Sequence, residues 1–224
     1  MNPYASPRAA TTHANDYRWA PLEAVPSGEE TTVEESGKPP REWRVVMTPD
    51  EAWFVASGAS GAVVMTHAEL AQKCSLMLAT NAPALVAPRL GAKGRAAVFR
   101  LRGPSLDRFR AWLLSKRDEH IAASLRKRTR FALPLGVLMV ALTVVGERFD
   151  PFMMIFGAGL LVLAFVGPRF PSPKMFVFDA LLWVSFAASH ALSAYNGSGL
   201  SAFFVFFCLF VAYGLYRAYI FWRL

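Results

Sequence analysis

Four long apolar runs occupy the sequence from residue 131 onward, and they restrict its fold more than any other feature. The runs cover residues 131–146, 152–167, 175–195 and 200–221. A helix needs about 20 apolar residues to cross the hydrocarbon core of a bilayer, so the last two runs are long enough by themselves. The first two must include flanking residues or thin the bilayer locally. We therefore predict a transmembrane bundle of four helices over residues 131–224, with a re-entrant hairpin in place of the first two spans as the alternative.

Charged residues between the runs predict the orientation of the helices. Lys and Arg residues favour the cytoplasmic side of a membrane. They are found at residues 126–130, at Arg169 with Lys174, and at Arg217 with Arg223, whereas the alternate loops at 147–150 and 196–199 carry no excess of them. The pattern predicts a multi-pass protein with both termini in the cytoplasm.

Few polar residues interrupt the apolar runs. Asp179 and His190 lie eleven positions apart in the third run, so on a helix they share one face at a separation of about 16 Å. Ionisable residues at membrane depth are costly to bury and are therefore functional candidates. One interpretation is a proton pathway or a ligand site. We favour the other, in which Asp179 pairs with Arg217 of the fourth run and His190 caps a helix interface, because buried charges are normally paired.

Glycines in the first two runs predict close contact between helices. Gly136 lies in the first run, and Gly157 and Gly159 lie in the second. Small residues let two helix backbones approach each other in a membrane. The Gly-x-x-x-Gly spacing typical of helix dimers is not formed by these glycines, so they give little reason to predict a dimer.

Residues 1–40 are predicted to be a disordered acidic tail. They contain six prolines, an acidic stretch with glutamates at positions 29, 30, 34 and 35, and no apolar stretch of the kind found in signal peptides. A segment of this composition buries too little apolar surface to offset the entropy lost on ordering.

Residues 41–104 alternate between short apolar stretches and turn signals such as Thr48-Pro49-Asp50. This pattern predicts a small antiparallel β-domain, which the charge pattern puts in the cytoplasm. The expected strands are residues 43–47, 52–56, 62–65, 76–79, 84–87 and 96–101, and residues 67–73 are a candidate short helix. Cys74 and Cys208 lie in such different surroundings that they predict no disulfide.

Residues 105–130 have the period of a basic, amphipathic juxtamembrane helix, with Leu106, Phe109 and Leu113 on one face. The segment ends in a basic cluster directly before the first apolar run: Arg126, Lys127, Arg128 and Arg130. We predict that these four side chains contact anionic lipid, at about 1 kcal/mol each. Lipid explains the basic charge more economically than nucleic acid does, so we expect no nucleic-acid partner.

Sequence signatures of catalysis are absent. The chain contains no P-loop, no His-Glu-x-x-His and no Gly-x-Ser-x-Gly. Its four histidines, at positions 13, 67, 120 and 190, are scattered over four different segments, which argues against a multi-histidine metal site. We therefore expect no catalytic residue, no metal and no cofactor.

The order of elements over residues 41–116 resembles a known family. Short strands begin at Trp43 and end with residues 98–102, and an amphipathic helix with Leu106, Phe109 and Trp112 follows. This order resembles the PH-like β-domains of bacterial membrane proteins of the YcxB-like kind. The resemblance implies a membrane-proximal binding or scaffolding module of a bacterial inner (plasma) membrane protein, without catalytic residues.

Three functional classes are compatible with these features. The first is a non-enzymatic membrane adaptor, regulator, or assembly or immunity-type protein, whose β-domain and helices bind partners such as another membrane protein or a second copy of itself. The second is a small oligomeric transporter or channel with Asp179 and His190 on its pathway. The third, a membrane enzyme acting on lipid, needs a cluster of acidic or histidine residues at the interface that the sequence does not show. We favour the first class.

Overall fold

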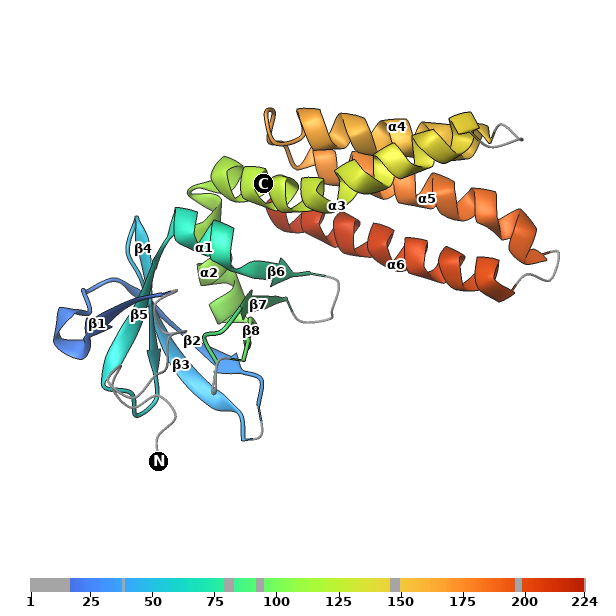
Figure 1. Cartoon of the computed structure of the whole chain (residues 1–224). Coiled ribbons are helices and arrows are strands. Elements are labelled where there is room, and N and C mark those ends of the chain that lie inside the picture. Colours follow the sequence, from blue (N-terminus) through green and yellow to red (C-terminus); the bar gives the residue numbers. More distant parts are fainter. Residues whose placement is uncertain are drawn as a thin grey trace. The chain divides into compact units, whose positions relative to one another are not determined.

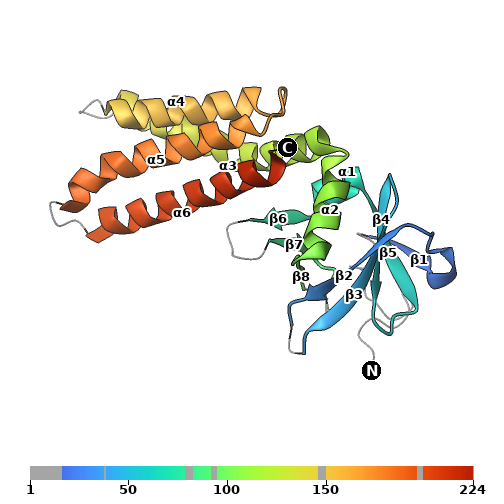
Figure 2. The same ribbon diagram turned by 180° about the vertical axis from the view of Figure 1, so that it is seen from behind.

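The computed structural model of the chain describes residues 17–37, 39–78, 83–91, 95–145, 150–195 and 199–223. The chain divides into two compact units, Met1–His120 and Ile121–Leu224 (Figures 1 and 2). The first unit is built on an eight-stranded antiparallel sheet in the order β1-β5-β4-β3-β2-β8-β7-β6. The second unit consists of helices. The predicted combination of an antiparallel β-domain and an apolar helical domain is therefore confirmed.

Six strands of the sheet coincide with the predicted ones. They are β3 (Arg41–Met47), β4 (Glu51–Ala56), β5 (Gly61–Thr66), β6 (Ser75–Met77), β7 (Ala84–Ala87) and β8 (Ala97–Arg100). Their inward side chains form the core, where the ring of Phe99 packs edge-on against Trp43 at 5.2 Å and lies 5.5 Å from Phe54. All three side chains are at most 1% exposed. Alternation of apolar residues was therefore a sound guide to this part of the sheet.

The predicted disordered tail is wrong for residues 18–35. Residues 18–21 form β1 (Arg18–Pro21), a short 3-10 helix (Leu22–Ala24) follows, and residues 29–35 form β2 (Glu29–Glu35). All seven residues of β2 pair with β3. The acidic composition concealed a strand alternation in which Thr31, Val33 and Glu35 are buried and their neighbours face outward. Partners from elsewhere in the chain supply the burial that the segment lacks by itself, and residues 1–16 lie outside the described residues.

The predicted helix over residues 105–130 is two helices. α2 (Pro104–Leu114) buries Phe109, Trp112 and Leu113, and α3 begins at Arg117. The break follows Ser115, whose hydroxyl donates a hydrogen bond to the carbonyl oxygen of Trp112 at 2.7 Å. Serine competes with the helical backbone in this way, so it favours helix ends. The candidate helix at residues 67–73 is confirmed as α1 (His67–Lys73), with Thr66 and Glu69 forming a capping box.

The second unit contains most of α3 (Arg117–Val145), together with α4 (Pro151–Val166), α5 (Lys174–Tyr195) and α6 (Gly199–Trp222). These helices match the four predicted apolar runs, except that α3 continues without a break through the predicted boundary at residue 130. Two helices, Arg117–Val145 and Ser201–Trp222, are long and apolar enough to cross a membrane, and α4 is a shorter apolar helix. Residues 146–149 and 196–198 lie outside the described residues, so the predicted loop charges there stay predictions.

Glycines bring the helices of the second unit into close contact, as predicted. A Cβ atom on Gly157 of α4 would lie 3.0 Å from the carbonyl oxygen of Gly136 of α3. One on Gly159 would lie 2.5 Å from a methyl group of Leu182 in α5. Contacts shorter than 3.4 Å are repulsive between such atoms, so α3 and α4 approach at a point where only glycine fits without a shift.

We expect Gly157→Val to destabilise the second unit by about 2 kcal/mol, because the added side chain must separate the α3 and α4 backbones. Ala158, the next residue, is exposed, so Ala158→Val is the matched control and should change the free energy of unfolding by less than about 0.5 kcal/mol. Unfolding of the purified full chain in mixed detergent and dodecyl sulfate micelles measures both values. Equal effects of the two substitutions would contradict the close contact.

Candidate functional site

Asp179 is the centre of a polar cluster inside the helical unit. Its side chain is 1% exposed, and it lies on α5 opposite Arg128 of α3. The Arg128 guanidinium donates to both carboxylate oxygens, from Nε at 2.7 Å and from Nη2 at 3.2 Å. Trp183, one turn after Asp179, donates its indole N–H to Oδ1 at 3.0 Å. Both oxygens of the carboxylate are therefore engaged by donors within the chain.

Aromatic rings complete the surroundings of Arg128. Its guanidinium carbon lies 5.5 Å from the ring centre of Phe131 and 5.4 Å from that of Trp183. Cation–π attraction adds to the charge-assisted hydrogen bonds and is strongest where water is excluded. The arrangement neutralises the one acidic group buried in this unit among the described residues, and it links α3 to α5.

The predicted pairing of Asp179 with Arg217 is wrong. Arg217 donates to the hydroxyl oxygen of Tyr213 at 2.9 Å, within its own helix α6. Residues four apart on a helix are neighbours, so this local partner requires no contact with another helix. Arg217 was expected to be the partner because the predicted topology places it at a depth in the membrane similar to that of Asp179.

His190 is not brought to Asp179, in agreement with their expected separation. Its ring lies 4.6 Å from Phe186, edge to face, and is stacked at 5.9 Å on Phe204. Of the predicted lipid-binding cluster, Arg126 and Arg130 are exposed and Lys127 is half-buried. Arg128 binds Asp179 and keeps 23% of its side chain exposed. The lipid contacts of all four residues stay a prediction.

A buried pair of histidines lies in the first unit. Nδ1 of His67 is 2.9 Å from Nε2 of His120, and Nε2 of His67 is 3.2 Å from the carbonyl oxygen of Pro49. A carbonyl can only accept, so Nε2 of neutral His67 carries the proton and Nδ1 accepts from His120. The ring of Trp112 stacks on His67 at 3.7 Å, and its indole N–H donates to the carbonyl oxygen of Thr48 at 2.6 Å.

Burial is the main cause of the altered titration of His67. It lowers the pKa of His67 below the ordinary value of 6.5, and the hydrogen bond to the Pro49 carbonyl opposes this shift only in part. The two histidines are 53 positions apart in the sequence. No spacing rule connects residues so far apart, which is why sequence reasoning treated them as scattered.

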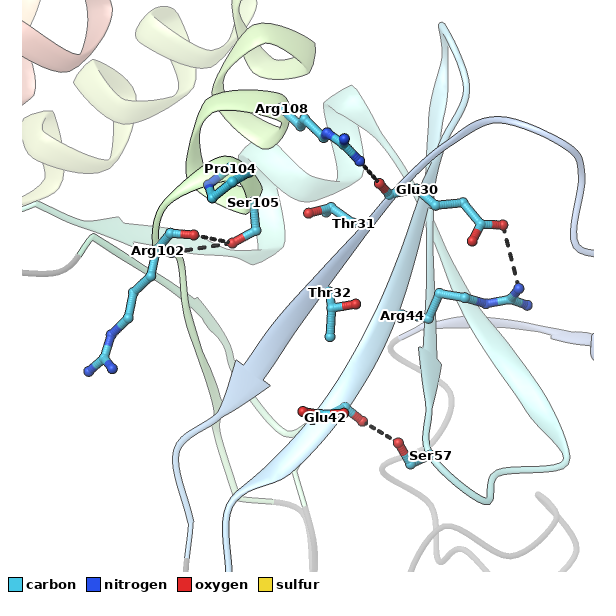
Figure 3. Close-up of a pocket in the computed structure, with 10 residues that line it drawn as sticks. All are labelled: Glu30, Thr31, Thr32, Glu42, Arg44, Ser57, Arg102, Pro104, Ser105 and Arg108. Carbon is cyan, nitrogen blue, oxygen red and sulfur yellow. Dashed lines mark hydrogen bonds and ion pairs between the residues drawn. The ribbon is translucent and has the colours of Figure 1, made fainter.

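A polar groove of about 530 Å³ lies on the sheet unit beside β2 (Figure 3). Its lining combines side chains from β2 and β3 with residues from the start of α2. The charged lining residues are Arg44, Arg102, Arg108, Glu30 and Glu42, and the hydroxyl-bearing ones are Thr31, Thr32, Ser57 and Ser105. Sequence reasoning missed this groove because three of its ten lining residues belong to the segment that was expected to be disordered, Glu30, Thr31 and Thr32.

Comparisons with protein-family models, with curated protein sequences and with solved structures find no match. Among the described residues, no three His, Cys, Asp or Glu side chains come together in a way that could hold a metal ion. The candidate sites are the three clusters described above: the groove, the His67–His120 pair and the Arg128–Asp179 pair.

We expect single substitutions of the ion pair to destabilise the helical unit by about 2–3 kcal/mol. Asp179→Leu leaves the Arg128 charge without its partner, and Arg128→Met does the same to Asp179. This value is below that for fully buried pairs because the Arg128 side chain is 23% exposed. The double variant should recover most of the loss, whereas the exposed Arg130→Gln serves as a neutral control. Unfolding in mixed micelles tests this, and additive losses in the double variant would rule out the pairing.

The lowered pKa of His67 predicts an acid-sensitive sheet unit. The folded state disfavours protonation of His67. The free energy of unfolding of the sheet unit is therefore unreduced above the unfolded pKa of about 6.5, and it decreases as the pH falls below that value. We expect His67→Gln to be less stable at pH 7.5 and to lose less stability between pH 7.5 and 5.5 than the unchanged chain. Hydrogen exchange of the β5 amides in mild detergent measures this, and parallel pH dependence of the two proteins would contradict the assignment.

Proposed function

We propose that this chain is a multi-pass protein of the bacterial inner membrane, in which α3 to α6 span the bilayer and the sheet unit is a cytoplasmic, non-enzymatic binding module. In this role it acts as an adaptor, a regulator, or an assembly or immunity-type factor. Its partners are anionic lipid at the membrane surface and a protein, either another membrane protein or a second copy of the chain.

The exposure of apolar side chains on the helices is the observation that carries this proposal. Each of the two helices long enough to span contains an apolar stretch of 18 residues. Only 17% of this stretch is buried in α3, and only 11% in Ser201–Trp222. A core helix of a water-soluble domain would be mostly buried. Large side chains such as Val137, Phe206 and Phe210 are instead more than half exposed, and hydrocarbon is the solvent in which such a surface is stable.

The lengths of the helices support four spans. At 1.5 Å per residue, the 22 residues of α5 extend about 33 Å, which matches the bilayer core of about 30 Å. α4 has 16 residues, about 24 Å. Its backbone hydrogen bonds continue past Val166, however, from the N–H groups of Gly167 and Phe170, which lengthens it by about one turn. This extension favours a transmembrane α4 over a re-entrant hairpin.

The polar groups inside the helical unit favour a structural role over transport. Both oxygens of Asp179 accept hydrogen bonds from Arg128 or Trp183, and the Arg128 cation already balances the carboxylate charge that a transported proton or cation would have to neutralise. His190 makes aromatic contacts 11 residues further along the helix. On the sheet unit, by contrast, the groove beside β2 offers exposed charges and hydroxyl groups to a partner. The resemblance of residues 41–116 to PH-like domains of the YcxB-like kind points to the same binding role.

Membrane topology gives the direct test. In a chain with Cys74→Ala and Cys208→Ala, we expect Ser198→Cys, in the α5–α6 loop, to react with an impermeant maleimide in intact cells. Ser172→Cys, between α4 and α5, should react only after the cells are permeabilised, because positive residues hold that loop inside. Labelling of Ser172→Cys in intact cells, or recovery of the chain from cells without detergent, would refute the proposal.

A further inference from the structure

β2 is paired along its full length on one side and only near its end on the other. β3 faces all seven residues, Glu29–Glu35, whereas β8 faces Glu34 and Glu35 only. The N–H of Ser36 donates to the carbonyl oxygen of Val98 at 2.8 Å. Peptide groups alternate sides along a strand, so the even-numbered residues of β2 direct their N–H and C=O groups toward β8. Thr32 and Glu30 therefore face a region that β8 does not reach.

That region is the groove described above (Figure 3). β8 ends at Arg100, and Gly103, with a φ of +50°, turns the chain into α2, so no further residue of β8 pairs with β2. The Nη1 of Arg108 donates to the carbonyl oxygen of Glu30 at 2.7 Å, in the place of a strand's N–H. Within the described part of the chain, the N–H and C=O of Thr32 have no hydrogen-bond partner on this side. A short length of strand edge is thus open to the groove.

The charges around the edge define the complementary partner. Glu30 lies 3.5 Å from Arg44, and Glu29 lies 3.8 Å from Arg108, so these charges are already paired. Two exposed charges that line the groove have no ion pair within the described residues. They are Arg102, before α2, and Glu42, on β3.

We propose that the open edge of β2 binds an extended peptide segment of a partner protein, which adds a short strand beside Thr32 and carries one acidic and one basic side chain. The acidic side chain pairs with Arg102, and the basic one reaches across Thr32 to Glu42. Strand addition of this kind takes affinity from main-chain hydrogen bonds and specificity from neighbouring side chains. This inference rests on the proposed role of the sheet unit as a binding module and names the class of its partner.

Two substitutions at one position isolate the main-chain contact. Thr32→Pro removes an N–H that the fold itself does not use, and proline is tolerated at such an edge position. Thr32→Val keeps the N–H and the β-branched shape. A phage library of random ten-residue peptides, selected on the full chain in detergent micelles, supplies the probe. We expect Thr32→Pro to weaken binding of a selected peptide about tenfold or more, and Thr32→Val to change it less than about twofold.

Two further measurements complete the test. In the unchanged chain, the bound peptide should slow hydrogen exchange at the Thr32 amide, a readout that does not depend on the folding of Thr32→Pro. Arg102→Glu should weaken binding, and replacing the acidic residue of the peptide by lysine should restore it. The proposal is overturned if the library yields no binder, if selected peptides bind Thr32→Pro as tightly as the unchanged chain, or if Thr32 exchange is unaffected. Maleimide labelling of the same proteins tests the membrane topology separately, so a failure of peptide binding with normal labelling refutes the peptide site alone.

Discussion

The pairing of Asp179 with Arg128 is the interaction on which the arrangement of the helical unit depends. An unpaired charge in such apolar surroundings would be prohibitively unfavourable, so every arrangement of these helices must bring a donor to Asp179. Meeting that requirement fixes the rotation of both α3 and α5, because each side chain must point at the other. Trp183 then follows one turn later and donates to the same carboxylate. Further along α3, its close approach to α4 at Gly136 and Gly157 adds a second contact that holds the helices together.

Much of this architecture could be predicted from the sequence, because it follows from local periodicity. Alternation located six of the eight strands, and the apolar runs located the four long helices. The failures share one cause, which is that partners far away in the sequence override local composition. β2 looked disordered because its pairing partner β3 was not considered, and Asp179 was assigned to Arg217 although Arg128 of α3 is its partner. The His67–His120 pair had no local signal at all.

The two units solve the problem of burying polar groups in different ways. The helical unit satisfies its buried carboxylate internally, with three donors around Asp179. The sheet unit leaves polar groups open at its surface, where water or a partner can satisfy them. The proposed role as a membrane adaptor would use this division, because a part in lipid must satisfy its own polar groups while a part in water can offer unsatisfied ones to a partner. The unpaired edge of β2 belongs to the sheet unit and is one of these open polar surfaces. The sequence had placed this strand in a disordered tail.

The separation of Arg128 and Asp179 along the chain has a consequence for biosynthesis. The two residues are 51 positions apart, and at typical synthesis rates of 5–20 residues per second the aspartate is made roughly 3–10 s after the arginine. In a chain inserted as proposed, α3 must therefore wait at the membrane with an unmatched cation. Phosphate headgroups are the nearest counter-ions during that interval, since the long arginine side chain can extend to the interface. Lipid phosphate would then be a transient counter-ion of Arg128, which Asp179 replaces once α5 has been inserted.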